Sequence, residues 1–84
     1  MEYQVKHNVD ESRFEVEIDG LLSVVEYQIE GNTIDIFHTG VPQELSGRGI
    51  AAALTKAILE YAEKENLKVV PTCPYIQKYI ERHS

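Results

Sequence analysis

The sequence lacks tryptophan, has a single cysteine, Cys73, and has no long run of apolar residues. One cysteine excludes an internal disulfide and is typical of proteins from a reducing compartment. A membrane-spanning helix needs about 20 consecutive apolar residues, so no membrane segment is predicted. The N-terminus also lacks the basic and then apolar arrangement of a signal peptide. Together these absences predict a cytoplasmic protein.

Basic residues are few, since eight Lys and Arg stand against 14 Asp and Glu, for a net charge of −6. Because no Lys or Arg cluster is present, binding to nucleic acid is not expected. The three histidines and one cysteine are too scattered to form a metal-ligand pattern, so no metal site is predicted. His7 and His83 lie near the termini and are expected at the surface.

The first half of the chain shows the alternation of apolar and polar residues that is typical of half-buried strands. This pattern predicts strands at about 14–18, 21–29 and 33–38, and an edge strand near His7. An Asp-Gly pair at 19–20 and a Gly-Asn pair at 31–32 separate these strands as tight turns. The strands are therefore expected to form an antiparallel meander.

The second half changes to helical spacing, with apolar residues every three or four positions from Ile50 to Tyr61. A helix is predicted at about 47–65, with Asn66 as its C-cap. A short strand at 68–70 is expected to run parallel to the preceding strand, and Pro74 to begin a last helix. The prediction is one α+β domain, 1–84, with a mostly antiparallel sheet and the order β-β-β-β-α-β-α.

Two glycines stand one residue apart at the start of the longer helix, in Ser46-Gly47-Arg48-Gly49. Glycine lets a backbone approach an oxyanion closely, and the free N–H groups of a first helical turn bind anions. The motif predicts that the amides of residues 47–51 bind a phosphate-bearing ligand. The side chain of Arg48 either contacts the phosphate or points to water. Alternatively, the glycines only shape a tight turn between strand and helix.

The same motif resembles the cofactor loop of the GCN5-related N-acetyltransferases, Gln/Arg-x-x-Gly-x-Gly/Ala, with Glu44 in the Gln/Arg position. The likeness is closer to the small single-domain branch of that superfamily. It covers about residues 6–83 and includes His38-Thr39, Val41-Pro42 and the run from Val70 to Tyr75. The resemblance implies a truncated acetyltransferase fold that binds acetyl-CoA or CoA and transfers acetyl to an unknown amine. It implies cofactor contacts at Val41, Ser46, Gly47, Arg48, Gly49, Ile50, Ala51, Cys73 and Tyr75.

Three residues are candidates for chemistry in such a site. Cys73 lies between a predicted strand and the start of a predicted helix, a position that lowers the pKa of a thiol. It is either a reactive thiol beside the thioester or a small buried residue. His38 shares its strand face with Ile34 and Ile36, and is either a general base or a histidine packed near the core. By resemblance Tyr79 protonates the leaving thiolate, and its alternative role is packing. Glu44 is expected to face solvent.

Three functions remain open on the sequence. The leading interpretation is an N-acetyltransferase in which an amine attacks acetyl-CoA directly, with an acidic surface that mildly favours a cationic acceptor. The second is a module that binds CoA or acetyl-CoA with little or no turnover. The third is a small interaction domain whose glycine loop is structural. The chain is expected to be a monomer or, through its exposed edge strand, a weak dimer.

Overall fold

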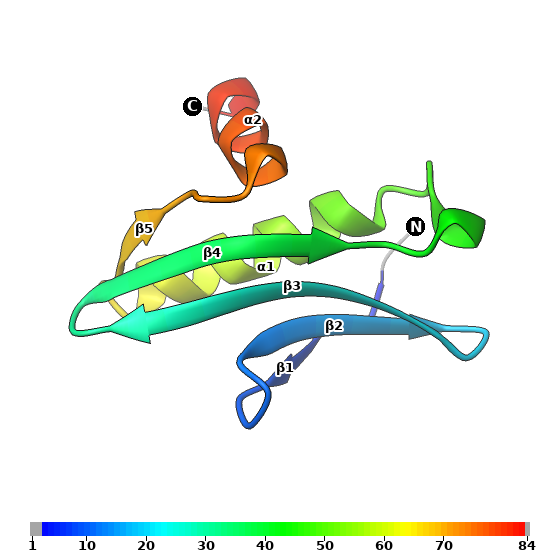
Figure 1. Ribbon diagram of the computed structural model, residues 1–84, viewed down its shortest axis with the longest axis horizontal. Coiled ribbons are helices and arrows are strands. Elements are labelled where there is room, and N and C mark those ends of the chain that lie inside the picture. The colour runs from blue at the N-terminus through cyan, green and yellow to red at the C-terminus, as the bar shows by residue number, and fades with distance from the viewer. Residues whose placement is uncertain (1–2, 84) are drawn as a thin grey trace.

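The computed structural model describes residues 3–83, which form a five-stranded sheet and two α-helices (Figure 1). The elements are β1 (Lys6–Asn8), β2 (Arg13–Ile18), β3 (Leu21–Glu30), β4 (Thr33–Gly40), a 3₁₀ turn η1 (Gln43–Leu45), α1 (Ile50–Lys64), β5 (Lys68–Val70) and α2 (Pro74–His83). The α+β class and the order β-β-β-β-α-β-α are confirmed. The predicted domain limits, 1–84, include residues 1, 2 and 84, which lie outside the described residues.

The sheet follows the chain, with strand order β1-β2-β3-β4-β5. The first four strands pair antiparallel, and β5 pairs parallel to β4 because α1 makes the crossover between them. Asp19 and Gly20 both have positive φ, 53° and 77°, which is what the central residues of a two-residue I′ hairpin adopt. Local turn chemistry therefore specifies the predicted meander.

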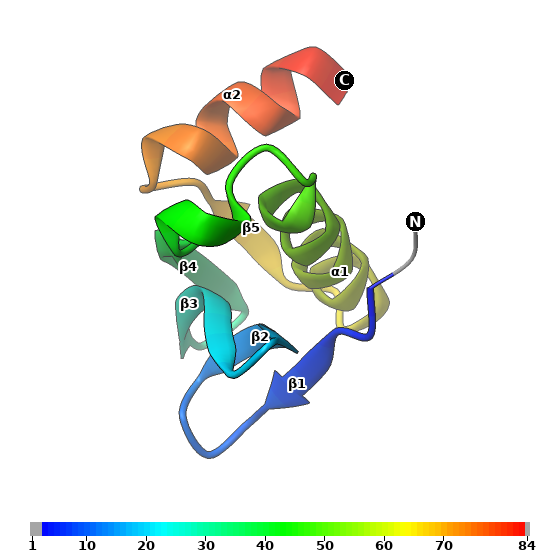
Figure 2. The ribbon, with the colours of Figure 1, turned by 90° about the vertical axis from the view of Figure 1, so that its right-hand side faces the viewer.

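The core lies on one face of this sheet, where α1 packs (Figure 2). Ile50, Leu54 and Ile58 of α1 are almost completely buried, at spacings of four residues that place them on one side of the helix. No helix covers the other face of β2–β4 in the described chain, and this second face is called the open face below. Neither helix within residues 3–83 is long and apolar enough to cross a membrane.

An irregularity in β4 changes which side chains face the core. Tyr27 pairs with Ile36 and the adjacent Glu26 pairs with His38, so Phe37 is an extra residue on β4 and forms a β-bulge. Beyond the bulge the alternation is reversed, and the side chain of His38 is 55% exposed, beside Glu26 on the open face. The prediction that His38 shares a face with Ile34 and Ile36 is therefore wrong.

The expectation that His7 lies at the surface is also wrong, because the imidazole belongs to a cluster of aromatic rings from β2, β3 and α1. It stacks on Phe14 with a centroid distance of 4.0 Å and meets the ring of Tyr61 edge-on at 4.6 Å. Its Nε2 lies 2.7 Å from the hydroxyl of Tyr27. Burial in this cluster lowers the pKa of His7 below the usual value.

This lowered pKa predicts a loss of stability at mildly acidic pH. The folded state favours neutral His7, whereas the unfolded chain takes up a proton at a pKa of about 6.5. The stabilisation is therefore fully present above about pH 6.5 and decreases as the pH falls toward the folded-state pKa. Urea unfolding should show a lower midpoint at pH 5.5 than at pH 7.5, and His7→Gln should reduce that difference. An equal difference in the variant would contradict this role of His7.

Candidate functional site

The loop between β4 and α1 holds its two glycines in a conformation that other residues rarely adopt. Gly47 and Gly49 have φ of 79° and 77°, so α1 starts at Ile50, three residues later than predicted. Within the described residues no side chain caps the start of α1. The N–H groups of its first turn are consequently available to an anion, and the positive end of the helix dipole adds to their attraction.

A groove of about 270 Å³ opens in front of this loop, and it is called the loop groove below. A Cβ built on Gly47 or Gly49 would meet no atom within 4 Å, so the space beside both residues is open to a ligand. The lining residues come from the end of β4, the loop, and both helices: Val41, Leu45, Ser46, Gly47, Gly49, Ile50, Ala51, Ala52 and Tyr75. Seven of the nine sequence-predicted contact residues are in this set, and Arg48 and Cys73 are not.

Arg48 lies toward the other side of α1. It lines a separate groove of about 450 Å³, together with Tyr3, Val5 and residues of α1. Its carbonyl oxygen accepts a hydrogen bond from the Tyr3 hydroxyl at 2.5 Å, which ties the N-terminal segment to the loop. The loop groove therefore lacks the Arg48 side chain, and no charged side chain is among its lining residues. Glu44 is exposed and lies outside the loop groove.

The loop groove lies where β4 and the chain after β5 separate. The parallel pairing of β5 with β4 ends at Asp35 and Val70, and Pro71 follows, which has no N–H for a further ladder bond. Thr72 still donates its hydroxyl hydrogen to Asp35, at 2.5 Å between oxygens, and the amide of Cys73 donates to the carbonyl of Ile36 at 3.0 Å. Within the described chain, residues 37–40 of β4 therefore have no strand partner on the side of β4 where β5 pairs with residues 33–35.

Cys73 lies at this separation, directly before α2, and is only 8% exposed. Its Sγ is 3.6 Å from Oγ1 of Thr39, which the bulge in β4 turns toward it. Burial raises the pKa of the thiol, but hydrogen bonds from the Thr39 side chain and from the backbone amides of Ile76, Tyr75 and Thr39 outweigh it, and the pKa is lowered overall. The direction of this shift is the one that the position of Cys73 before a helix predicts. The Thr39 side chain is a contact that the sequence did not indicate.

The two tyrosines of α2 occupy different positions. Tyr75, in the first turn, lines the loop groove and is 38% exposed. Burial, and then the neighbouring Tyr79, raise its pKa, against a smaller opposing effect of Arg82. Tyr79 lies one turn further along and stacks on His83 with a centroid distance of 4.2 Å. Tyr75 is therefore the tyrosine of α2 that borders the loop groove.

His38 is separated from Cys73 by the β4 strand itself. Its Nε2 is 4.0 Å from Oε1 of Glu26 on the open face, while the next residue, Thr39, faces Cys73. A Cβ on Gly40 would lie 3.1 Å from this Nε2, so glycine leaves room for the imidazole. Within residues 3–83, no three His, Cys, Asp or Glu side chains are grouped so that they could hold a metal ion.

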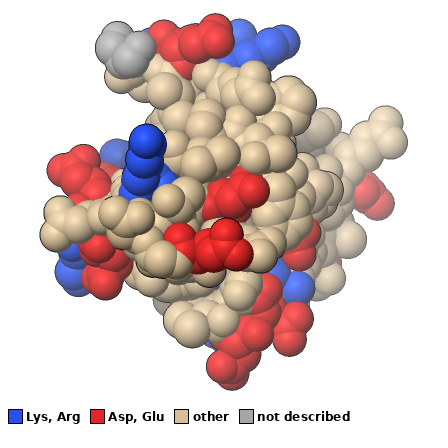
Figure 3. All heavy atoms as spheres, turned by 60° about the vertical axis from the view of Figure 1, so that its left-hand side comes forward, with Lys and Arg blue, Asp and Glu red and all other residues tan. Residues whose placement is uncertain are grey.

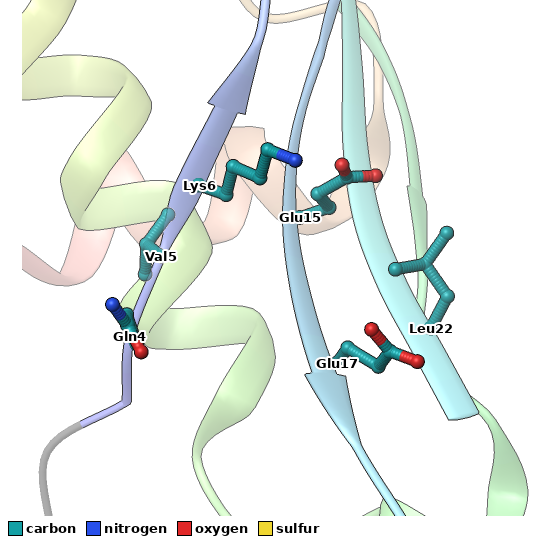
Figure 4. Close-up of a pocket in the computed structure, with 6 residues that line it drawn as sticks. All are labelled: Gln4, Val5, Lys6, Glu15, Glu17 and Leu22. Carbon is teal, nitrogen blue, oxygen red and sulfur yellow. The ribbon is translucent and has the colours of Figure 1, made fainter. Parts of the chain in front are cut away.

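A larger groove of about 490 Å³ lies across β1, β2 and β3, away from the loop (Figure 4). It contains none of the residues predicted from the sequence, and its side chains include Lys6, Glu15, Glu17 and Leu22. Glu15 already accepts hydrogen bonds from Arg13 at 3.0 Å and from Asn8 at 3.1 Å. These contacts give Glu15 a structural role, so the loop groove is the stronger candidate for the functional site.

Comparison with known proteins identifies a family. The sequence profile of the GCN5-related N-acetyl-transferase family matches residues 13–84. The protein NATD1 of Gallus gallus is 41% identical over 83 residues, and the match covers 95% of this chain and 76% of that protein. NATD1 of Homo sapiens is 40% identical over 83 residues, with 95% of this chain and 74% of the human protein covered.

A solved structure has the same fold. The NMR solution structure of a GCN5-like protein from Staphylococcus aureus superposes with a TM-score of 0.75 at 32% sequence identity. The superposition covers 96% of this chain and 80% of that chain. The matched profile, the NATD1 relatives and the shared fold show that the chain belongs to the GCN5-related N-acetyltransferase family.

Proposed function

We propose that the chain binds acetyl-CoA, with the pyrophosphate on the backbone amides of residues 47–51 and the thioester near Cys73. The observation that carries the proposal is the loop groove, in which two positive-φ glycines and an uncapped helix start face open space. A pyrophosphate fits this site because it needs several N–H donors and no bulky side chain at the point of approach. The groove runs toward the start of α2, where Tyr75 follows Cys73 by two residues.

Acetyl-CoA supplies an activated acetyl group, whose carbonyl carbon forms a bond to an amine nitrogen as the bond to sulfur breaks. The backbone N–H of Val41 follows the part of β4 that β5 leaves unpaired, and in this proposal it polarises the carbonyl oxygen, because the Thr39 amide already bonds to Cys73. Tyr75 lines the loop groove, and in this proposal its hydroxyl, which is protonated at neutral pH, donates its proton to the leaving sulfur. This assignment replaces Tyr79 as the acid.

The acceptor amine approaches from the open face in this proposal. Nε2 of His38 lies on that face beside the Glu26 carboxylate, across β4 from Cys73. In this proposal the ammonium group gives its proton to His38 on the open face, and the neutral amine then passes the unpaired edge of β4 to reach the thioester. The Glu26 carboxylate attracts an amine that arrives in its protonated form. The proposed acceptor class is therefore a cationic primary amine.

Isothermal titration of acetyl-CoA and of CoA into the purified chain tests the proposal, followed by release of free CoA thiol across a panel of amines. We expect micromolar binding of both ligands and CoA release with at least one cationic amine. Binding without release across the panel would support the alternative of a CoA-binding module with little or no turnover. Absence of binding would contradict both and leave the loop as a structural turn.

A further inference from the structure

The hydroxyl of Tyr3 makes a contact with the glycine loop that the proposed chemistry does not use. It donates a hydrogen bond to the backbone carbonyl of Arg48, 2.5 Å away and 45 positions later in the sequence. Tyr3 belongs to the segment that leads into β1, in which Val5 also packs on the core, and β1 in turn pairs with β2. Figure 2 shows β1 and this segment beside α1. The sheet therefore holds Tyr3 next to the start of α1.

The backbone of the loop is fixed by hydrogen bonds at both ends and by few between them. Before the loop, the amide and the hydroxyl of Ser46 both donate to a carbonyl of the 3₁₀ turn η1, at 3.1 and 2.9 Å. After it, the carbonyl of Gly49 accepts from the amide of Ala53 at 3.0 Å. Among residues 3–83, the Tyr3 hydroxyl is the one group that hydrogen-bonds to the backbone of residues 47–48.

The peptide group between Arg48 and Gly49 needs such a restraint, because glycine does not supply one. Glycine adopts positive and negative φ about equally readily, so rotation about ψ of Arg48 and φ of Gly49 can reverse the direction of this peptide group. The peptide bond is trans, and the carbonyl of Arg48 and the N–H of Gly49 consequently point in opposite directions. By holding the carbonyl, Tyr3 therefore directs the Gly49 N–H away from itself.

The direction of each N–H matters in this loop because charge does not help to bind an anion there. The chain has a net charge of −6, and no charged side chain lines the loop groove. On the face drawn in Figure 3, acidic side chains gather at the centre and at the bottom. An anion in the loop groove therefore depends on backbone donors that already point toward it.

We propose that Tyr3 is a positioning residue that holds the Gly49 N–H toward the pyrophosphate of the ligand. The inference rests on the proposed binding of acetyl-CoA at the loop. Gly49 lines both the loop groove and the groove beside Arg48, whereas Tyr3 lines only the latter, so an N–H that points away from Tyr3 faces the loop groove. No group in the described part of the chain accepts this N–H. A donor that is already directed at the ligand needs no reorientation on binding.

Tyr3→Phe tests the proposal, because it removes the hydroxyl and keeps the ring that packs on the core. Isothermal titration should show that this variant binds CoA about fivefold more weakly than the wild type, the effect of one hydrogen bond. In NMR spectra of the free proteins, the amide signal of Gly49 should shift or broaden in the variant, because that amide shares its peptide group with the Arg48 carbonyl. A role of Tyr3 in general stability alone would not change this signal selectively.

Tyr27→Phe is the matched control. The Tyr27 hydroxyl lies 2.7 Å from Nε2 of His7, so the same substitution removes a hydrogen bond in the aromatic cluster and none at the loop. This variant should bind CoA with the affinity of the wild type, and its Gly49 amide signal should be unchanged.

Three outcomes would overturn the inference while leaving the proposed function in place. The first is equal affinity of Tyr3→Phe and the wild type for CoA. The second is an unchanged Gly49 amide signal in Tyr3→Phe. The third is an equal loss of affinity in Tyr27→Phe, which would assign the effect to general stability. If the wild type itself does not bind CoA, the proposed function fails and the inference fails with it.

Discussion

Replacement of Gly47 and Gly49 together by aspartate is expected to weaken acetyl-CoA binding by about 100-fold or more. Both residues have φ near +78°, a region in which an L side chain is strained, so the variant shifts the amides that face the ligand. The new Cβ atoms and carboxylates would also occupy the open space in front of the loop, where the pyrophosphate is expected. Like charges at this short range oppose binding further. Isothermal titration of acetyl-CoA measures the loss.

The matched control is aspartate at Gly20 and Gly31. These glycines have φ of 77° and 62°, and a Cβ on either would also meet no atom within 4 Å. The control therefore imposes similar backbone strain and the same change in charge, but at two hairpin turns outside the loop groove. It should bind acetyl-CoA within about threefold of the wild type. Wild-type affinity in the Gly47→Asp/Gly49→Asp variant would show that the loop is a structural turn.

The fold and the loop could be predicted because their determinants are local in the sequence. Asp19-Gly20 determines a turn through the φ angles of two adjacent residues, and Gly47 and Gly49 determine the loop in the same way. The apolar spacing of α1 specifies its buried side directly. The wrong prediction for the start of α1 also has a local cause. The backbone of Gly49 is in the left-handed region, so Gly49 cannot belong to the helix.

The errors arose where a contact depends on an irregular feature. The alternation of residues 33–38 predicts faces correctly only if the strand is unbroken, and the bulge at Phe37 reverses it. That reversal places His38 on the open face and turns Thr39 toward Cys73, a residue 34 positions away. The position of His7 near the terminus predicts a surface residue, but its ring partners Phe14, Tyr27 and Tyr61 come from three other elements.

The positions of Lys78 and Arg82 show a different limit of sequence analysis. Helical spacing places Lys78 and Arg82 on the outward side of α2, and both are indeed exposed. Their proximity to the loop groove depends on Ala52 of α1 and Tyr75 of α2 coming together in space. Periodicity within one helix contains no information about that pairing. An exposed cation beside a groove and one in open solvent have the same sequence pattern.

Loss of the Thr39 hydroxyl is expected to slow the reaction of the Cys73 thiol with alkylating reagents. Thr39→Val keeps the shape of the side chain but removes the hydroxyl that hydrogen-bonds to the thiolate, so the pKa of Cys73 should rise. One charge-assisted hydrogen bond corresponds to about one pKa unit or more, so alkylation by iodoacetamide at pH 7 should be about tenfold slower in the variant. The difference between the two rates should become smaller as the pH is raised and both thiols ionise. Cys73 is the one cysteine of the chain, so the modified mass measures this site alone.

Thr55→Val is the matched control for this experiment. Thr55 is fully buried in α1, and its hydroxyl donates to the carbonyl of Ala51 at 2.8 Å, so the same substitution removes a hydrogen bond that does not involve Cys73. Its alkylation rate at pH 7 should equal that of the wild type. Equal rates in Thr39→Val and Thr55→Val would contradict thiolate stabilisation by Thr39. Addition of acetyl-CoA should slow alkylation in all three proteins, because the proposed thioester position lies beside Cys73. Unchanged alkylation under saturating acetyl-CoA would place the thioester elsewhere.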